Sequence, residues 1–255
     1  MMHMRRISLV SWLLALLCLP MTGMTSTGMK LDRAPDKARD VAALQRGAKI
    51  FVNYCLNCHS ANYMRYNRLR DLGLTEQQIK DNLLFTADKV GEPMTIAMRS
   101  QEAKEWFGAP PPDLTVIARA KASAAGSGAD WLYTYLRTFY RDDSRPTGWN
   151  NLVFDRVSMP HVMWELQGEY GLRLVEKIDV HGEKVQLKKL EMLKPGKLPP
   201  DEYDALMADL VGYLVYMSEP IAETRKQIGM GVLAALALLF ALTYLLKREY
   251  WKDVH

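Results

Sequence analysis

The segment FVNYCLNCHS, residues 51–60, places two cysteines three positions apart and a histidine directly after the second. This C-x-x-C-H pattern is the attachment signature of c-type haem. In such a site both cysteine sulfurs bond to the porphyrin, and the adjacent histidine binds the iron from one side. Cys55, Cys58 and His59 are therefore the first candidates for a chemical site.

Three other interpretations of the cysteine pair compete: a chance match, a disulfide or thiol redox motif, and a zinc site. Structural zinc usually takes four Cys or His ligands, but the chain has no second C-x-x-C and no closely spaced pair of histidines. A thioredoxin-type motif follows a strand, whereas the residues before Cys55 have a helical pattern. The third cysteine, Cys18, lies in an apolar N-terminal run, which disfavours a disulfide scaffold. The motif therefore predicts one covalently bound haem c.

The other face of a haem iron needs a second ligand or stays open. Methionine there raises the reduction potential and suits electron transfer, whereas an open position suits ligand binding or catalysis. Among the 15 methionines, Met159 stands in a loop in which Pro160 fixes the backbone behind it. Met159 is the main candidate, helped by the family resemblance given below; His161 is the alternative, and Met94, Met98, Met163 and Met192 remain open. Arg119 is a candidate to bind an anionic haem propionate, but a solvated helix arginine would have the same sequence pattern.

Two helices are expected to position these residues. The haem motif ends a predicted helix over residues 36–55, whose apolar positions recur every three or four residues. A second helix is predicted over residues 201–217, with Asp201 as its N-cap. Gly47 on the first helix lets the second cross it closely, beside Tyr213 on the second. This pairing resembles the crossed terminal helices of the class I cytochrome c fold.

The long stretch between these helices contains shorter elements with local signals. Thr75 to Gln78 resembles a capping box at the start of a helix. A proline run over residues 110–112 forms a loop, after which Asp113 is expected to cap a short helix. The remaining predictions are a helix over 128–140, a loop and short helix over 148–168, and a hairpin over 171–192.

The first residues have the pattern of a secretory signal. Arg5 and Arg6 precede an apolar run over residues 7–19, and small residues follow. This run is too short to span a membrane, but it has the length of a signal-peptide core. We predict a signal peptide over residues 1–27, with an approximate boundary, and export of residues 28–226 as the haem domain.

A second apolar segment lies near the C-terminus. Ile228 to Leu246 are 19 residues without a charge, and a helix of this length extends about 28 Å, close to the thickness of a bilayer core. Basic residues flank it on both sides, so the positive-inside rule alone is weak. Together with the export signal, the segment predicts a transmembrane anchor over 228–246, a cytoplasmic tail over 247–255, and contact with membrane lipid.

The charge of the chain argues against one class of partner. The formal net charge is only +4 over 255 residues, and no basic stripe of the kind that binds nucleic acid is present. We therefore expect no nucleic-acid partner.

These features together resemble the cytochrome c1 family, the haem subunits of cytochrome bc1 complexes. The resemblance rests on CLNCH at 55–59, GAPPPDLTVIAR at 108–119, VSMP at 157–160 and the single C-terminal anchor with its basic end. It implies a mainly α fold with a class I cytochrome c core and a long insertion. It also implies His59 and Met159 as axial ligands and Arg119 near a propionate. The short form, without extra cysteines in the body, is similar to proteobacterial members.

The same resemblance implies electron transfer. In this family the Rieske iron–sulfur protein delivers one electron from quinol oxidation, and the c1 haem passes it to a soluble or membrane-bound cytochrome c. Cytochrome b supplies the quinol site. We therefore expect a subunit of quinol–cytochrome c reductase that is not an enzyme on its own, in the bacterial inner membrane with its haem domain in the periplasm. The alternatives are a c-type subunit of a terminal oxidase and an open-site haem sensor or enzyme.

Overall fold

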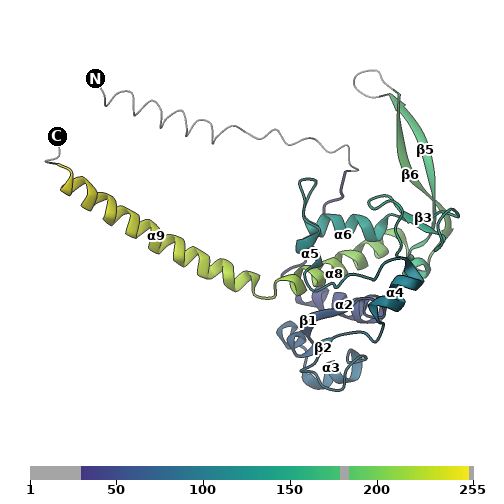
Figure 1. Ribbon diagram of the computed structural model, residues 1–255, viewed down its shortest axis with the longest axis horizontal. Helices are drawn as coiled ribbons and strands as arrows, with labels where there is room; N and C mark the ends of the chain where they lie inside the picture. Colours follow the sequence, from purple (N-terminus) through teal and green to yellow (C-terminus); the bar gives the residue numbers. More distant parts are fainter. Residues whose placement is uncertain (1–29, 179–183, 253–255) are drawn as a thin grey trace. The chain divides into compact units, whose positions relative to one another are not determined.

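A computed structural model describes residues 30–178 and 184–252 of the chain. The predicted signal peptide and Cys18 lie outside these residues. Within the described part, the chain is mainly helical, and its strands form antiparallel pairs: β1 with β2, β3 with β4, and β5 with β6 (Figure 1). The prediction of a mainly α fold is confirmed.

The elements follow one another along the chain with short loops between them. The α-helices are α2 (Val41–Ile50), α3 (Glu76–Asn82), α4 (Ser100–Phe107), α5 (Ile117–Ala120), α6 (Gly128–Arg137), α7 (Trp164–Gln167), α8 (Pro200–Ser218) and α9 (Ala222–Tyr250). A π-helical turn, η1 (Phe51–Cys55), and a 3-10 helix, η2 (Tyr66–Leu72), add to them. The strands are β1 (Ala61–Arg65), β2 (Pro93–Met94), β3 (Phe139–Arg141), β4 (Trp149–Asn151), β5 (Gly168–Ile178) and β6 (Lys184–Pro195).

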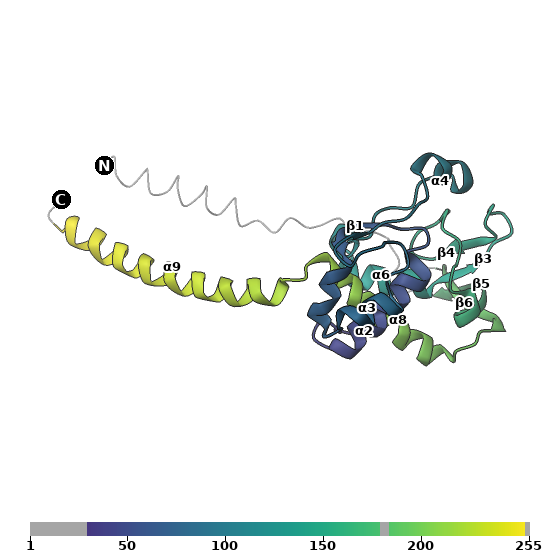
Figure 2. The same ribbon diagram turned by 90° about the horizontal axis from the view of Figure 1, so that it is seen from below.

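The centre of the domain is the crossing of α2 and α8, which lie against each other in both ribbon views (Figures 1 and 2). At the crossing, a Cβ atom on Gly47 would lie 2.2 Å from the backbone oxygen of Asp209 and 2.7 Å from Cβ of Tyr213. Only glycine therefore allows this approach. The rings of Phe51 and Tyr213 pack beside it, with centroids 5.5 Å apart. The predicted crossing is confirmed.

An ion pair also joins these two helices. The Arg46 guanidinium on α2 lies 2.5 Å from the Asp209 carboxylate on α8. The Asp209 side chain is 7% exposed, whereas the Arg46 side chain is 55% exposed. The pair therefore satisfies a carboxylate that the crossing would otherwise bury alone.

The ends of the two helices differ from the sequence predictions. The first begins at Val41 instead of residue 36, because the Asp40 side chain caps it by accepting the backbone N–H of Ala43 at 3.0 Å. The helix α8 begins at Pro200, so the prediction of Asp201 as N-cap is wrong. A proline fits the first turn because its missing N–H has no partner there in any helix. Asp201 instead lies in the first turn, where its charge suits the helix dipole.

Two other local predictions are confirmed and one is modified. Thr75 and Gln78 form a full capping box at the start of α3. The hairpin of β5 and β6 is present, and its tip, residues 179–183, lies outside the described residues. The helix predicted over 128–140 ends at Arg137, and the chain continues as strand β3, which pairs with β4.

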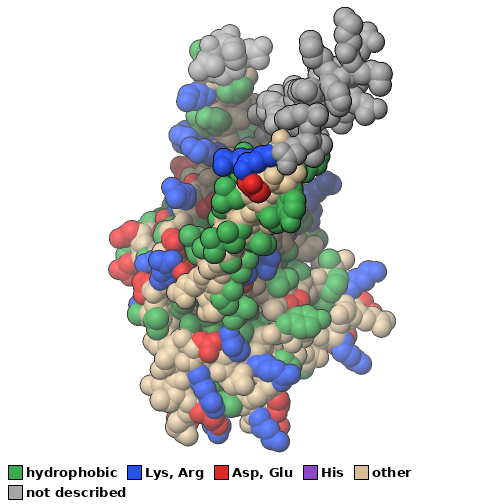
Figure 3. Space-filling model, turned by 90° about the vertical axis from the view of Figure 1, so that its left-hand side faces the viewer, with side chains coloured by type: hydrophobic (Ala, Val, Ile, Leu, Met, Phe, Trp, Pro, Cys, Tyr) green, Lys and Arg blue, Asp and Glu red, His purple; other side chains and the backbone are tan. Residues whose placement is uncertain are grey.

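The C-terminal helix α9 spans 29 residues, Ala222–Tyr250. It is long enough and apolar enough to cross a membrane, and its hydrophobic side chains are exposed. Figure 3 shows such side chains at the surface, with Lys and Arg side chains near the end of the helix. The helix begins before the predicted anchor because the polar residues at its start, such as Glu223, are also helical. Glu223 pairs with Arg39 of the domain at 2.7 Å.

Candidate haem site

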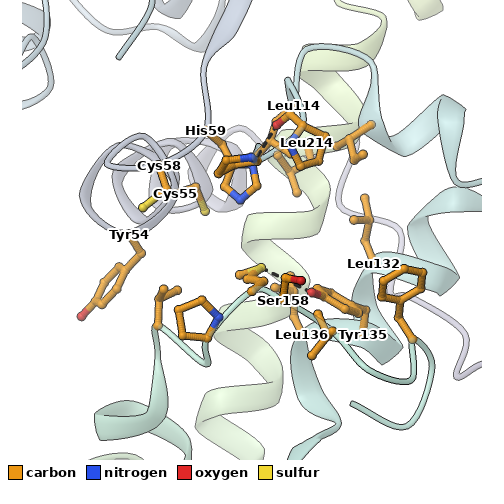
Figure 4. A pocket seen from close by; sticks show the side chains of 18 of the residues that line it. Tyr54, Cys55, Cys58, His59, Leu114, Leu132, Tyr135, Leu136, Ser158 and Leu214 are labelled. Carbon is orange, nitrogen blue, oxygen red and sulfur yellow. Dashed lines mark hydrogen bonds between the residues drawn. The ribbon is translucent and has the colours of Figure 1, made fainter. Parts of the chain in front are cut away.

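A cavity of about 320 Å³ lies where the helical core meets the loops, and its size and apolar walls are typical of ligand sites. Its walls include the end of the first helical segment with Cys55, Cys58 and His59, the loop over 107–114, and the loop over 154–163. The helices α6 and α8 supply apolar side chains, among them Leu132 and Leu214 (Figure 4).

The two cysteines follow directly from the core helix. A π-helical turn replaces the last turn of the helix, and Leu56 N–H then bonds to Phe51 O at 2.9 Å. Such turns are rare and often mark functional sites. His59 N–H bonds back to Cys55 O at 2.9 Å, which closes the motif into a compact turn. Cys55 and Cys58 are free thiols, and burial raises the pKa of Cys55 to about 12, so its sulfur is uncharged.

The imidazole of His59 points into the cavity and is oriented from behind (Figure 4). Its Nδ1 lies 2.7 Å from the carbonyl oxygen of Pro112. A carbonyl can only accept, so Nδ1 carries the proton and donates it. Burial lowers the pKa of His59, which favours the neutral ring. The neutral ring then has its lone pair on Nε2, available for a metal, and the carbonyl fixes both tautomer and orientation.

The loop that supplies Pro112 is itself tied to the haem motif. The Asp113 carboxylate accepts the backbone N–H groups of Asn62 and Thr115, both at 2.8 Å. Leu114 N–H bonds to Ser60 O at 2.9 Å. The prediction that Asp113 caps a short helix is therefore wrong. That helix, α5, begins at Ile117, and Asp113 instead fastens the proline loop over His59.

Met159 lines the same cavity, on the wall that carries Tyr135. Tyr135 and Ser158 lie across the cavity from His59 in Figure 4. The Tyr135 hydroxyl donates to the Met159 sulfur at 3.3 Å. The structure thus brings together four of the five predicted site residues, Cys55, Cys58, His59 and Met159, around one space.

Two buried asparagines, which sequence reasoning missed, hold the loop that leads to Met159. Asn151 is 1% exposed. Its amide donates to Tyr135 O at 2.8 Å, and its Oδ1 accepts two backbone N–H groups of the loop at 2.9 and 3.3 Å. The Oδ1 of Asn150 accepts the N–H of Arg156 at 2.9 Å, which supports the left-handed backbone of Arg156, with φ 55°. The pair NN within a loop was the only signal in the sequence.

Of the alternative ligands, Met163 also lines the cavity, whereas His161 and Met192 do not. His161 is 2% exposed, and its ring stacks on Phe139 and meets the edge of Trp149. Burial lowers its pKa to about 4, so the ring is neutral. Met192 lies on strand β6 and is 42% exposed.

Arg119, the predicted propionate partner, does not line the cavity, whereas a nearby lysine does. Arg119 is exposed on the short helix α5 and is not among the side chains that line the cavity. Lys121, two residues later, does line it. Its ammonium lies 4.4 Å from the centre of the Trp131 ring, another residue of the wall.

The residues of the cavity fit a c-type haem. One wall offers two free thiols and an imidazole lone pair, the other offers a thioether, and the walls between are apolar. Nitrogen and sulfur are the axial donors of electron-transfer haems. Within residues 30–178 and 184–252, no group of three or more His, Cys, Asp or Glu side chains could hold a metal ion, so the zinc alternative has no ligand set in this part of the chain.

Comparison with known proteins assigns the family. The sequence model described as "Cytochrome C1 family" matches residues 33–177 and 199–254. The chain is 47% identical over 229 residues to cytochrome c1 of Allochromatium vinosum, covering 89% of this chain and 91% of that one. The chain therefore belongs to the cytochrome c1 family. Residues 178–198, which include all of strand β6, fall outside the family match.

Two further relatives have different names. A protein of Nitrosomonas europaea named "Ammonia monooxygenase gamma subunit" is 50% identical over 244 residues, covering 95% of this chain and 97% of that one. A protein named "Cytochrome b/c1" of Bradyrhizobium diazoefficiens is 25% identical over 247 residues, covering 85% of this chain and 34% of that protein.

Proposed function

We propose that this chain is the haem subunit of a cytochrome bc1 complex, which accepts electrons from a Rieske iron–sulfur protein and passes them to a soluble or membrane-bound cytochrome c. One observation carries the proposal. A single apolar cavity has the C-x-x-C-H motif on one wall and Met159 on the opposite wall. Membership of the cytochrome c1 family supports the wider assignment to a bc1 complex.

In this proposal each site residue has one task. Cys55 and Cys58 would hold a single haem c through their sulfurs, and His59 and Met159 would bind its iron. When bound, the haem supplies a one-electron iron couple. The chain itself makes and breaks no substrate bond, so it is not an enzyme on its own. A cavity closed on both axial sides favours electron transfer over the open-site sensor or enzyme.

The surrounding groups hold these ligands and exclude water. The Pro112 carbonyl keeps His59 in one tautomer, and the Tyr135 hydroxyl restrains the Met159 sulfur. The apolar walls lower the local dielectric and keep water from the iron. For the anionic propionates we propose Lys121, which lines the cavity, with the exposed Arg119 as a more distant positive charge.

The membrane arrangement follows from α9. We propose that this helix crosses the bacterial inner membrane once beside cytochrome b, with the haem domain in the periplasm and residues 247–255 in the cytoplasm. A relative in which cytochrome b and c1 share one name supports a cytochrome b partner. The exposed apolar surface of the helix requires lipid or another membrane helix around it.

Two alternative assemblies predict different partners. A terminal-oxidase subunit would co-purify with oxidase chains. The printed name of the Nitrosomonas relative suggests a third assembly, a monooxygenase. We would solubilise membranes gently, isolate the tagged chain and identify its partners. Cytochrome b and a Rieske protein are expected, with quinol-dependent reduction of added cytochrome c. Oxidase or monooxygenase chains in their place would contradict the proposal.

The haem assignment is tested separately. Acid and organic solvent should leave the haem on the polypeptide, and free extraction would contradict thioether attachment. Met159→Leu should abolish the weak far-red absorption band of a thioether–iron bond and lower the reduction potential. Met192→Leu is the matched control and should change neither property. The opposite pattern would show that the ligand loop was assigned wrongly.

A further inference from the structure

We propose that His161 is a positioning residue, whose ring, stacked in an aromatic cluster behind the cavity wall, holds Met159 against the haem iron. This inference rests on the proposed function, in which Met159 is the axial ligand. It assigns a role to a buried histidine that neither binds the haem nor faces the cavity.

The direction of the side chains along the ligand loop is the first observation. Met159, Pro160, Val162 and Met163 all line the cavity. His161 stands in the middle of this run, is not among the lining side chains, and is 2% exposed. The loop therefore presents its neighbours to the cavity, while His161 anchors it on the opposite side.

The anchor is a pair of aromatic contacts with good geometry. The imidazole lies nearly parallel to the Phe139 ring, at 3° and 4.8 Å between centroids. It meets the Trp149 ring edge-on, at 82° and 5.1 Å. Parallel stacking and edge-to-face contact are the two arrangements that aromatic rings prefer. Phe139 and Trp149 come from the paired strands β3 and β4, so the ring is held by a fixed surface.

These contacts connect His161 to Met159 by a second path, through Phe139 and Tyr135. Phe139 packs against Tyr135 at 5.1 Å between centroids. Tyr135 in turn donates to the Met159 sulfur at 3.3 Å. From Met159 the backbone leads through Pro160 to His161 and back to Phe139. The thioether is therefore fixed both through its sulfur and through its backbone by one cluster.

The backbone between Met159 and His161 has little conformational freedom. Pro160 has a restricted φ, and it limits the conformations of the residue before it. Movement of the His161 ring would therefore move Met159 instead of being absorbed between them. The carbonyl of His161 also accepts the N–H of Trp164 at 3.3 Å, which joins the loop to the start of α7.

The face and edge of the ring are the parts that contact the aromatic cluster. In the described structure, His161 Nε2 and Gln167 Oε1 are both buried without a hydrogen bond of good geometry, although the Gln167 side chain lies close enough to raise the pKa of His161 against the effect of burial. A buried polar atom without a partner is destabilising. A flat apolar ring of similar size should therefore replace the imidazole, whereas a branched aliphatic side chain should not.

The test uses the complete haem-loaded chain in detergent and two substitutions that retain bulk, His161→Leu and His161→Phe. Three properties are measured: the far-red thioether–iron band of the oxidised form, the reduction potential, and carbon monoxide binding to the reduced form. We expect His161→Leu to lower the ratio of ligated to unligated Met159 at least about tenfold, since leucine has no flat ring to stack on Phe139 and Trp149. The band should weaken, the potential should fall and carbon monoxide should bind. His161→Phe should behave like the parent.

Controls separate positioning from general loosening. Ile79→Ala removes a fully buried side chain on α3, away from the cavity lining, and should lower stability without changing the three properties. The proposal is wrong if His161→Leu retains the parent properties, if His161→Phe loses them, or if Ile79→Ala loses them equally. Met159→Leu tests the proposed function separately. If it loses the band while His161→Leu does not, only this inference fails.

Discussion

The helix crossing at Gly47 allows a prediction whose size follows from the structure. Gly47→Ala would place a methyl group 2.2 Å from the Asp209 backbone oxygen and 2.7 Å from Tyr213 Cβ. Neither atom can rotate away, so α2 and α8 must separate. Alanine gains about 1 kcal/mol of helix propensity over glycine. Overpacking costs about 1–3 kcal/mol, and the weakened contact of Phe51 with Tyr213 adds about 1 kcal/mol.

The expected net loss is about 2 kcal/mol of unfolding free energy, which lowers the Tm by roughly 4–8 °C for a domain of this size. Thermal unfolding of the haem-loaded protein, followed by circular dichroism, measures it. Gly91→Ala is the matched control, because nothing lies within 4 Å of a Cβ there, and it should stay within about 0.5 kcal/mol of the parent. A Gly47→Ala protein as stable as the parent would refute the close crossing.

Three further predictions test other contacts. Tyr135→Phe removes the hydrogen bond to the Met159 sulfur, so the sulfur becomes a better electron donor to the iron. Redox titration should give a reduction potential lower by up to about 60 mV with the far-red band retained, and a higher potential would contradict this. Asp209→Asn should lower the unfolding free energy, measured with denaturant, by about 1 kcal/mol, because the Arg46 side chain is largely exposed and water screens the ion pair. A loss above about 3 kcal/mol would mean that this screening is weak. Removal of residues 228–255 should give a protein that stays soluble on fractionation without detergent and has an unchanged haem spectrum, since the buried core ends at Ser218. Aggregation would show that the domain needs its last helix.

Features encoded by neighbouring residues were predictable from the sequence. The capping box at Thr75 depends on residues three apart, and the C-x-x-C-H motif is a local pattern. The crossing at Gly47 was also predictable, because a glycine on an apolar helix face that leads into a C-x-x-C-H motif resembles the pattern of the class I cytochrome c fold.

The supports of the ligand loop depend on distant residues. Asn151 bonds to the carbonyl of Tyr135, and His161 stacks on Phe139. No local pattern distinguishes these side chains from ordinary polar loop residues. The sequence is equally uninformative about Arg119. Whether Arg119 or Lys121 lines the cavity depends on how the short helix α5 is turned.

The crossing of α2 and α8 also has a consequence for the order in which the protein is assembled. The helices belong to opposite ends of the domain, at 41–50 and 200–218, and Leu210 and Leu214 of α8 close one side of the cavity. Chains are made from the N-terminus, at about 5–20 residues per second. The cysteine motif therefore emerges several seconds before the helix that encloses it. During that interval the two thiols stay accessible on an unfinished chain. The haem attachment that we propose would be open to the thiols of the unfinished chain, and the packing of α8 over the cavity would end this access.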